Sequence, residues 1–101
     1  MLKNFRTYQL ALDFYRQARC QKLSSNLYSQ LTRAASSIAL NLAEGHGRQT
    51  KADQRRFFTI AFGSLRECQS ILDLASSPTP QSVESADILG AHIYKLIKAC
   101  Y

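Results

Sequence analysis

One stretch, residues 33–48, constrains the fold more than any other part of the chain. It reads RAASSIALNLAEGHGR and consists largely of small and apolar residues. Polar residues recur through it at spacings of four, four, three and four: Arg33, Ser37, Asn41, Glu44 and Arg48. Because a helix has 3.6 residues per turn, these side chains fall on one stripe of one helix. A helix that is apolar over most of the remaining circumference must be covered on more than one side.

Two helices share this wide apolar arc. In the helix that contains residues 33–48, an apolar stripe beside the polar one is formed by Leu27, Leu31, Ile38 and Leu42, with alanine at 34, 35, 39 and 43. In the helix that follows it, one side is lined by Phe58, Ala61, Leu65, Cys68 and Leu72, and another by Phe57, Ile60, Ser64, Ile71 and Leu74. A single neighbouring helix covers less than this, so we expect the protein to be a homo-oligomer.

The whole chain predicts an all-α fold in one domain, residues 1–101. Apolar periodicity indicates helices at about residues 3–19, 25–44, 50–75 and 79–101. Ser24 or Ser25, Thr50 and Thr79 are suitable N-caps, and Gly45 is the expected left-handed C-cap of the second helix. The connections are short, and short connections favour an antiparallel up-down-up-down four-helix bundle.

Composition excludes several classes of protein. Hydrophobic residues make up 46% and charged residues 20%, as in a folded domain. The longest uncharged run, residues 57–65, is too short to cross a bilayer, so no membrane partner is expected. The N-terminal apolar segment contains charges and does not resemble a signal peptide. Three cysteines without metal-ligand spacing indicate a buried Cys68 and free thiols at Cys20 and Cys100, which favours the cytoplasm.

Catalytic motifs are absent from the sequence. A di-iron bundle needs Glu-x-x-His, but Gly47, Ser70 and Asp87 stand where the histidines would be. His46 and His92 have no second ligand four residues away, and the glycines around His46 are typical of a helix end. We therefore expect no catalytic residues, no metal and no cofactor, and the hypothesis of a small-molecule or metal-dependent enzyme is weaker than the two binding hypotheses given below.

Two carboxylates, Glu44 and Glu67, stand among small or apolar residues, where an isolated charge is costly. Arg33, Arg48 and Arg66 are the available partners, either between helices or between subunits. The alternative is an exposed ion pair of little energetic weight. The neighbouring Gly63 and Ser64 predict a close approach of the third helix to the alanine-rich second helix. We expect a structural or interface role for Arg33, Ser37, Asn41, Glu44, Gly63, Ser64 and Glu67.

Positive charge is concentrated in the first part of the chain. Residues 1–56 hold ten Lys or Arg against three Asp or Glu, whereas residues 57–101 hold three against four. Such an imbalance is typical of a surface that faces a polyanion, although a merely solvated basic face has the same composition.

The strongest ligand-contact candidates surround the connection between the second and third helices: Arg48, Lys51, Arg55 and Arg56. A helix N-terminus there also favours anions. The end of the first helix adds Arg16, Arg19 and Lys22. In an antiparallel bundle the two groups lie at opposite ends, so each monomer carries two basic ends. Such cations bind phosphate backbones, of RNA or DNA, without reading bases.

The stretch RAASSIALNLAEGHGRQT and the later RRFFTIAFGSLRE, together spanning residues 33–67, resemble the four-helix bundle protein family. That family includes proteins encoded within intervening sequences of bacterial 23S rRNA genes and accessory variability proteins of diversity-generating retroelements. A weaker resemblance continues upstream through Tyr8, Ala11 and Tyr15. The chain departs from a common family form at Ala39, where proline often stands.

This resemblance implies a ring-shaped homopentamer with a basic surface. It also implies a nucleic-acid partner and, for the retroelement members, a reverse transcriptase that the protein assists. The leading hypothesis is therefore a non-enzymatic, oligomeric nucleic-acid-binding accessory protein. The alternative is a protein-interaction scaffold of the rRNA intervening-sequence type, in which the basic surface meets an acidic partner protein.

Overall fold

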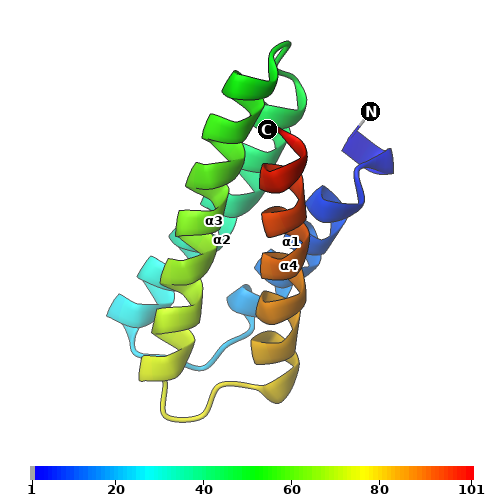
Figure 1. The fold of residues 1–101 in the computed structure, drawn as a ribbon. Helices are drawn as coiled ribbons and strands as arrows, with labels where there is room; N and C mark the ends of the chain where they lie inside the picture. Colours follow the sequence, from blue (N-terminus) through cyan, green and yellow to red (C-terminus); the bar gives the residue numbers. More distant parts are fainter. Residues whose placement is uncertain (1) are drawn as a thin grey trace.

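The computed structural model describes residues 2–101, which form a bundle of four helices (Figure 1). A short 3-10 helix, Leu2–Asn4, precedes α1 (Arg6–Arg19), α2 (Ser25–His46), α3 (Lys51–Leu74) and α4 (Pro80–Ala99). No strand occurs within residues 2–101, which confirms the predicted all-α class. The bundle is elongated, with extents of 41 × 21 × 19 Å.

The helices alternate in direction, so the bundle has two distinct ends (Figure 1). Consecutive helices pack side by side, and α4 also packs against α1. We call one end the α2–α3 end, because the turn between these helices lies there together with the start of α1 and the end of α4. The opposite end holds the α1–α2 and α3–α4 connections, and we call it the α1–α2 end.

Hydroxyl side chains begin three of the helices, as the sequence predicts. The Ser24 hydroxyl accepts a hydrogen bond from the backbone N–H of Leu27 at 3.3 Å, and that of Thr50 accepts from Asp53 at 3.1 Å. Thr79 caps α4 in the same way. The first helix begins later than expected, at Arg6, because Phe5 is extended and its ring stacks on His46, with centroids 4.6 Å apart.

The predicted left-handed cap at Gly45 is wrong. Helix α2 continues to His46, and no glycine among the described residues has a positive φ. Gly45 is buried because α3 crosses it closely: a Cβ placed there would lie 2.6 Å from Cε1 of Phe58. The residue is therefore small to permit helix packing, and Gly47 forms the C-cap.

The core follows the predicted face of α3. All five residues of the first α3 line are buried, as are Leu31, Ile38 and Leu42 of α2. In α1 the inward face is formed by Ala11, Phe14 and Ala18. The alanines let α1 approach its neighbours, while Tyr8 and Tyr15 are only half-buried. Val83 of α4 is 40% exposed.

A buried polar cluster ties α1 to α4 at the α1–α2 end. The Gln21 amide donates to the hydroxyls of Ser82 at 2.7 Å and Thr79 at 3.1 Å, and its carbonyl oxygen accepts from the Thr79 backbone N–H at 3.3 Å. Gln21 is 7% and Ser82 1% exposed. Because these buried groups satisfy one another, they hold the start of α4 against the end of α1.

Candidate nucleic-acid interface

Two arginines of the basic cluster flank one aromatic ring at the α2–α3 end. The guanidinium groups of Arg48 and Arg56 each lie 4.6 Å from the ring centroid of Phe57. Arg48 also forms an ion pair of 2.7 Å with Glu44, in which both side chains are substantially exposed. The two arginines are thus oriented by a neighbouring ring and remain accessible to an anion.

The other two members of the cluster hold the end of α4. The Lys51 ammonium donates to the carbonyl of Ala99 at 3.2 Å, and the Arg55 guanidinium donates to the carbonyl of Cys100 at 3.0 Å. The last carbonyls of a helix lack intrahelical partners and carry partial negative charge, so cations stabilise them. Each cation retains further N–H donors for a ligand.

Folding divides the charge between the two ends of the bundle. When each helix is divided at its midpoint, the half at the α2–α3 end consists of residues 2–12, 36–62 and 90–101. This half holds eight Lys or Arg against two Asp or Glu, whereas the other half holds five against five. The entire formal charge of +6 therefore belongs to the α2–α3 half, and the α1–α2 half is neutral.

The second predicted group lies at the α1–α2 end, as the antiparallel topology requires (Figure 1). Arg16 pairs with Asp13 at 3.1 Å, the Arg19 guanidinium lies 5.9 Å from the Tyr15 ring, and Lys22 is exposed. The structure does not bring these residues together with Arg48, Lys51, Arg55 and Arg56. Their role in nucleic-acid binding stays a prediction.

The polar stripe of α2 forms a hydrogen bond with α3 between two serine hydroxyls. The Asn41 amide donates to the Ser37 hydroxyl at 3.1 Å, and that hydroxyl lies 2.9 Å from the hydroxyl of Ser64. Arg33 is exposed, and Glu44 pairs with Arg48 at the end of its own helix. Within one chain, the expected charged network between α2 and α3 is therefore replaced by hydroxyl contacts and an exposed ion pair.

Two further interface predictions do not hold within one chain. Gly63 was expected to permit close helix approach, but it is exposed and no atom lies within 4 Å of a Cβ placed there. It faces away from α2 because Ser64, the next residue, makes the contact. Glu67 is also exposed, and no ion pair among the described residues includes it.

A comparison with known protein families places the chain. The model of the 23S rRNA-intervening sequence protein family matches residues 5–100. The chain belongs to this family. No curated protein matches it. The match covers all four helices, so the helical bundle and the polar stripe of α2 belong to the family region.

The remaining reactive groups of this family member form no cluster. Among residues 2–101, no three His, Cys, Asp or Glu side chains are placed to hold a metal ion. His92 makes a 3.0 Å hydrogen bond to the carbonyl of Ile88 at the edge of the core. Burial raises the pKa of the Cys68 thiol to about 12, with a smaller contribution from the Glu67 carboxylate. No helix in the described part is long and apolar enough to traverse a bilayer.

Sequence reasoning missed the cations that other helices bring to the α2–α3 end: Lys3, Arg6, Lys95 and Lys98. The last two lie in the part of the chain with a net negative charge. The available signal was topological, because an antiparallel bundle places the end of α4 beside the start of α3. Combining that topology with charge position would have found both lysines.

Proposed function

We propose that this protein is a non-enzymatic, oligomeric nucleic-acid-binding accessory protein that contacts phosphate backbones with its α2–α3 end. The observation that supports the proposal is the confinement of the whole net charge of +6 to that half of the bundle. Seven of its eight cations are exposed, and Arg55 is half-buried. A dense group of accessible cations displaces counterions from a polyanion, which drives association without base recognition.

Charge reversal in matched positions tests this proposal. Fluorescence anisotropy with labelled RNA and DNA should show affinity that falls steeply with salt. Arg48→Glu and Arg56→Glu should weaken binding to every sequence, each reducing the slope of log K against log salt by about one. Arg33→Glu is the control, because it makes an equal change of charge at an exposed position of α2 in the neutral half of the bundle. It should weaken binding less. Absence of salt-sensitive binding at low salt overturns the proposal.

The oligomeric part of the proposal is supported by apolar side chains on the outer faces of α2 and α3. Leu40 is 68% and Ile60 43% exposed. Leu40 follows Ser37 by three residues and Ile60 precedes Ser64 by four, so both lie about one turn from the hydroxyl contact, toward the α2–α3 end. Burying such side chains against another copy is favourable. Light scattering should show an oligomer, a pentamer by the family resemblance, and Leu40→Glu with Ile60→Glu should dissociate it. A monomer at micromolar concentration contradicts the proposal.

A finer form of the proposal places the protein in the cytoplasm beside a reverse transcriptase, as the resemblance to retroelement accessory proteins implies. Three free cysteines support a reducing compartment. A reverse-transcriptase gene next to this one supports the retroelement role, and an rRNA gene around it contradicts that role. A protein partner retained in a pull-down after nuclease treatment favours the scaffold alternative.

A further inference from the structure

The groove between α3 and α4 carries aromatic rings paired with cations. Arg55 lies 4.5 Å from the ring centroid of Tyr101, and the Lys98 ammonium lies 5.5 Å from that of Tyr94. A third pair, in which Arg66 lies 5.0 Å from the ring of Phe62, continues the series along α3. We call this region the α3–α4 seam and define it by Lys51, Arg55, Phe62, Arg66, Tyr94, Lys95, Lys98 and Tyr101.

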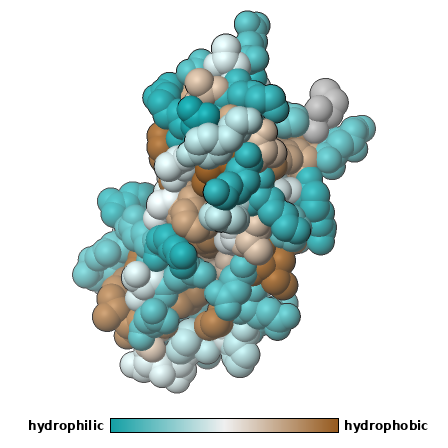
Figure 2. Space-filling model, in the orientation of Figure 1, coloured by the Kyte–Doolittle hydropathy of each residue, from teal (hydrophilic) through white to brown (hydrophobic). Residues whose placement is uncertain are grey.

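The seam is open to solvent and hollowed at one end. Tyr94 is 52% and Tyr101 81% exposed. A cavity of about 400 Å³ lies between Phe62 and Tyr94, with Leu65 and Gly90 in its lining. A Cβ at Gly90 would lie 2.7 Å from Cδ2 of Leu65, so the glycine lets the helices approach closely beneath the cavity. Figure 2 shows this face, where apolar patches lie between hydrophilic residues.

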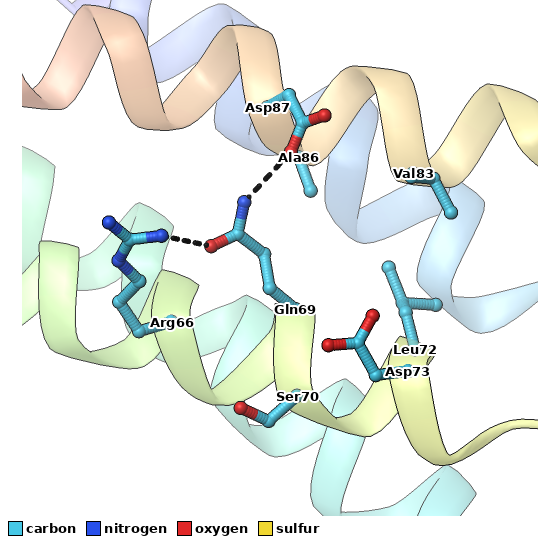
Figure 3. A pocket seen from close by; sticks show the side chains of 8 residues that line it. All are labelled: Arg66, Gln69, Ser70, Leu72, Asp73, Val83, Ala86 and Asp87. Carbon is cyan, nitrogen blue, oxygen red and sulfur yellow. Dashed lines mark hydrogen bonds between the residues drawn. The ribbon is translucent and has the colours of Figure 1, made fainter.

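Acidic residues limit the seam toward the α1–α2 end. Figure 3 shows the adjoining cavity of about 320 Å³, where the Arg66 guanidinium donates to Gln69 at 3.1 Å and the Gln69 amide donates to Asp87 at 3.0 Å. Asp73 lines the same cavity, and Asp87 lines both this cavity and the one between Phe62 and Tyr94. The two carboxylates disfavour a phosphate there, whereas the five cations of the seam favour one. A polyanion is therefore directed along the seam from Arg66 toward Lys51, a length of about 22 Å.

From this arrangement we infer that the α3–α4 seam binds single-stranded nucleic acid by stacking bases on Tyr94 and Tyr101 while the cations contact phosphates. The inference rests on the proposed function and names the nucleic-acid class and a site. Tyr94 and Tyr101 are exposed as well as paired with a cation, so their rings are accessible to a base. At a stacked spacing of about 3.4 Å per nucleotide, the seam accommodates roughly six nucleotides.

A duplex uses this site poorly. Aromatic side chains stack on bases only when the bases are unpaired, whereas a duplex presents phosphates alone to such a surface. Base stacking on an aromatic side chain strengthens binding and is tolerant of sequence. The seam is thus expected to prefer single strands, and the cations at the α2–α3 end serve both forms.

The test compares three variants on two probes. A labelled single strand of 15 thymidines (dT15) and a labelled 15-base-pair duplex are titrated with the protein, and binding is followed by fluorescence anisotropy. Tyr94→Leu and Tyr101→Leu should each weaken dT15 binding about tenfold with an unchanged salt slope, and should leave duplex binding unchanged. Tyr94→Phe keeps the ring and should bind dT15 like the unmodified protein. The chain has no tryptophan, so quenching of tyrosine fluorescence by dT15, reduced in Tyr94→Leu, reports stacking directly.

The outcomes separate this inference from the proposed function. Unchanged dT15 binding by both leucine variants overturns the seam but leaves salt-sensitive binding at the α2–α3 end intact. Tighter binding to the duplex than to dT15 overturns it in the same way. Loss of dT15 and duplex binding in equal measure, or a change in oligomer mass on Tyr94→Leu, contradicts stacking and assigns the seam to contact between copies. No binding to either probe by the unmodified protein overturns both.

Discussion

The two ends of the bundle hold their helix termini by different chemistry. At the α1–α2 end, neutral groups do so inside the protein: Gln21 bonds to Thr79 and Ser82. At the α2–α3 end, cations do so at the surface: Lys51 donates to the carbonyl of Ala99, the last residue of α4, and Arg55 donates to that of Cys100, which follows it. Both arrangements satisfy unpaired backbone groups, but only the second leaves accessible charge. The first end is thus held by uncharged groups and the second by accessible cations, to which the proposed function assigns recognition.

Removing the neutral cluster should give the largest effect on stability. Gln21→Ala leaves the buried hydroxyl of Ser82 and the backbone N–H of Thr79 with fewer partners, and we expect a loss of about 3 kcal/mol in the free energy of unfolding. Urea denaturation measures it. Gln81→Ala, an exposed glutamine on the same end, is the control. Nucleic-acid affinity should be unchanged, and a loss below about 0.5 kcal/mol would show that the cluster does not hold this end.

Two glycines probe a close helix contact and an open helix face, respectively. Gly45→Ala places a methyl group against Phe58 and should cost about 2 kcal/mol. Gly63→Ala, on the open outer face, should stabilise one chain by about 0.5–1 kcal/mol, because alanine favours the helix. Thermal unfolding of both variants measures the contrast. A loss on Gly63→Ala would show that another molecule covers this face, which supports the proposed oligomer.

The neutral half contains a buried thiol whose pKa is shifted by folding, that of Cys68. The pKa of Cys68 is raised from 9.0 to about 12 in the folded protein, so the folded state retains the thiol proton more strongly than the unfolded chain does. Its contribution is fully present below pH 9 and is lost as the pH rises toward 12, at about 1.4 kcal/mol per unit. The difference in unfolding free energy between the protein and Cys68→Ala, followed from pH 8 to pH 11, isolates this effect. A constant difference contradicts the raised pKa.

Removing the cations that bond to the end of α4 should have the smallest effect on stability. Lys51→Met and Arg55→Met remove charge from the end of α4, and each should lower stability by about 0.5 kcal/mol. The loss should shrink at high salt, because screening weakens an exposed charge, unlike the loss on Gln21→Ala. Urea denaturation at two salt concentrations checks this difference between the ends. Arg33→Met, an exposed change without a helix terminus nearby, should have no measurable effect.

Local patterns predicted what depends on neighbours in the sequence. The caps at Ser24, Thr50 and Thr79 follow from a hydroxyl meeting a backbone N–H three residues on, and each is present. The α3 core line also follows from periodicity alone, and Cys68 lies in it with no exposed surface. What failed depends on a second helix: Gly45 is a typical helix end in sequence, but Phe58 makes it a packing position.

The candidate site was predicted in part for the same reason. Arg48, Lys51, Arg55 and Arg56 were identified because they are close in sequence. That Lys51 and Arg55 also hold the end of α4 depends on a contact across about 45 residues, which periodicity does not reveal. The sequence did not predict Tyr94 as a site residue, because the cavity beside it forms only where α3 packs against α4.

The distribution of thiols makes the comparison of the two ends experimentally accessible. Cys20 is exposed at the α1–α2 end, whereas Cys68 and Cys100 are buried. A maleimide dye added to the folded protein will therefore label the neutral end, without a substitution and away from both the basic end and the seam. Energy transfer between such a dye and an oligonucleotide labelled at its 5′ or its 3′ end can then measure how far each end of a bound strand lies from the neutral end.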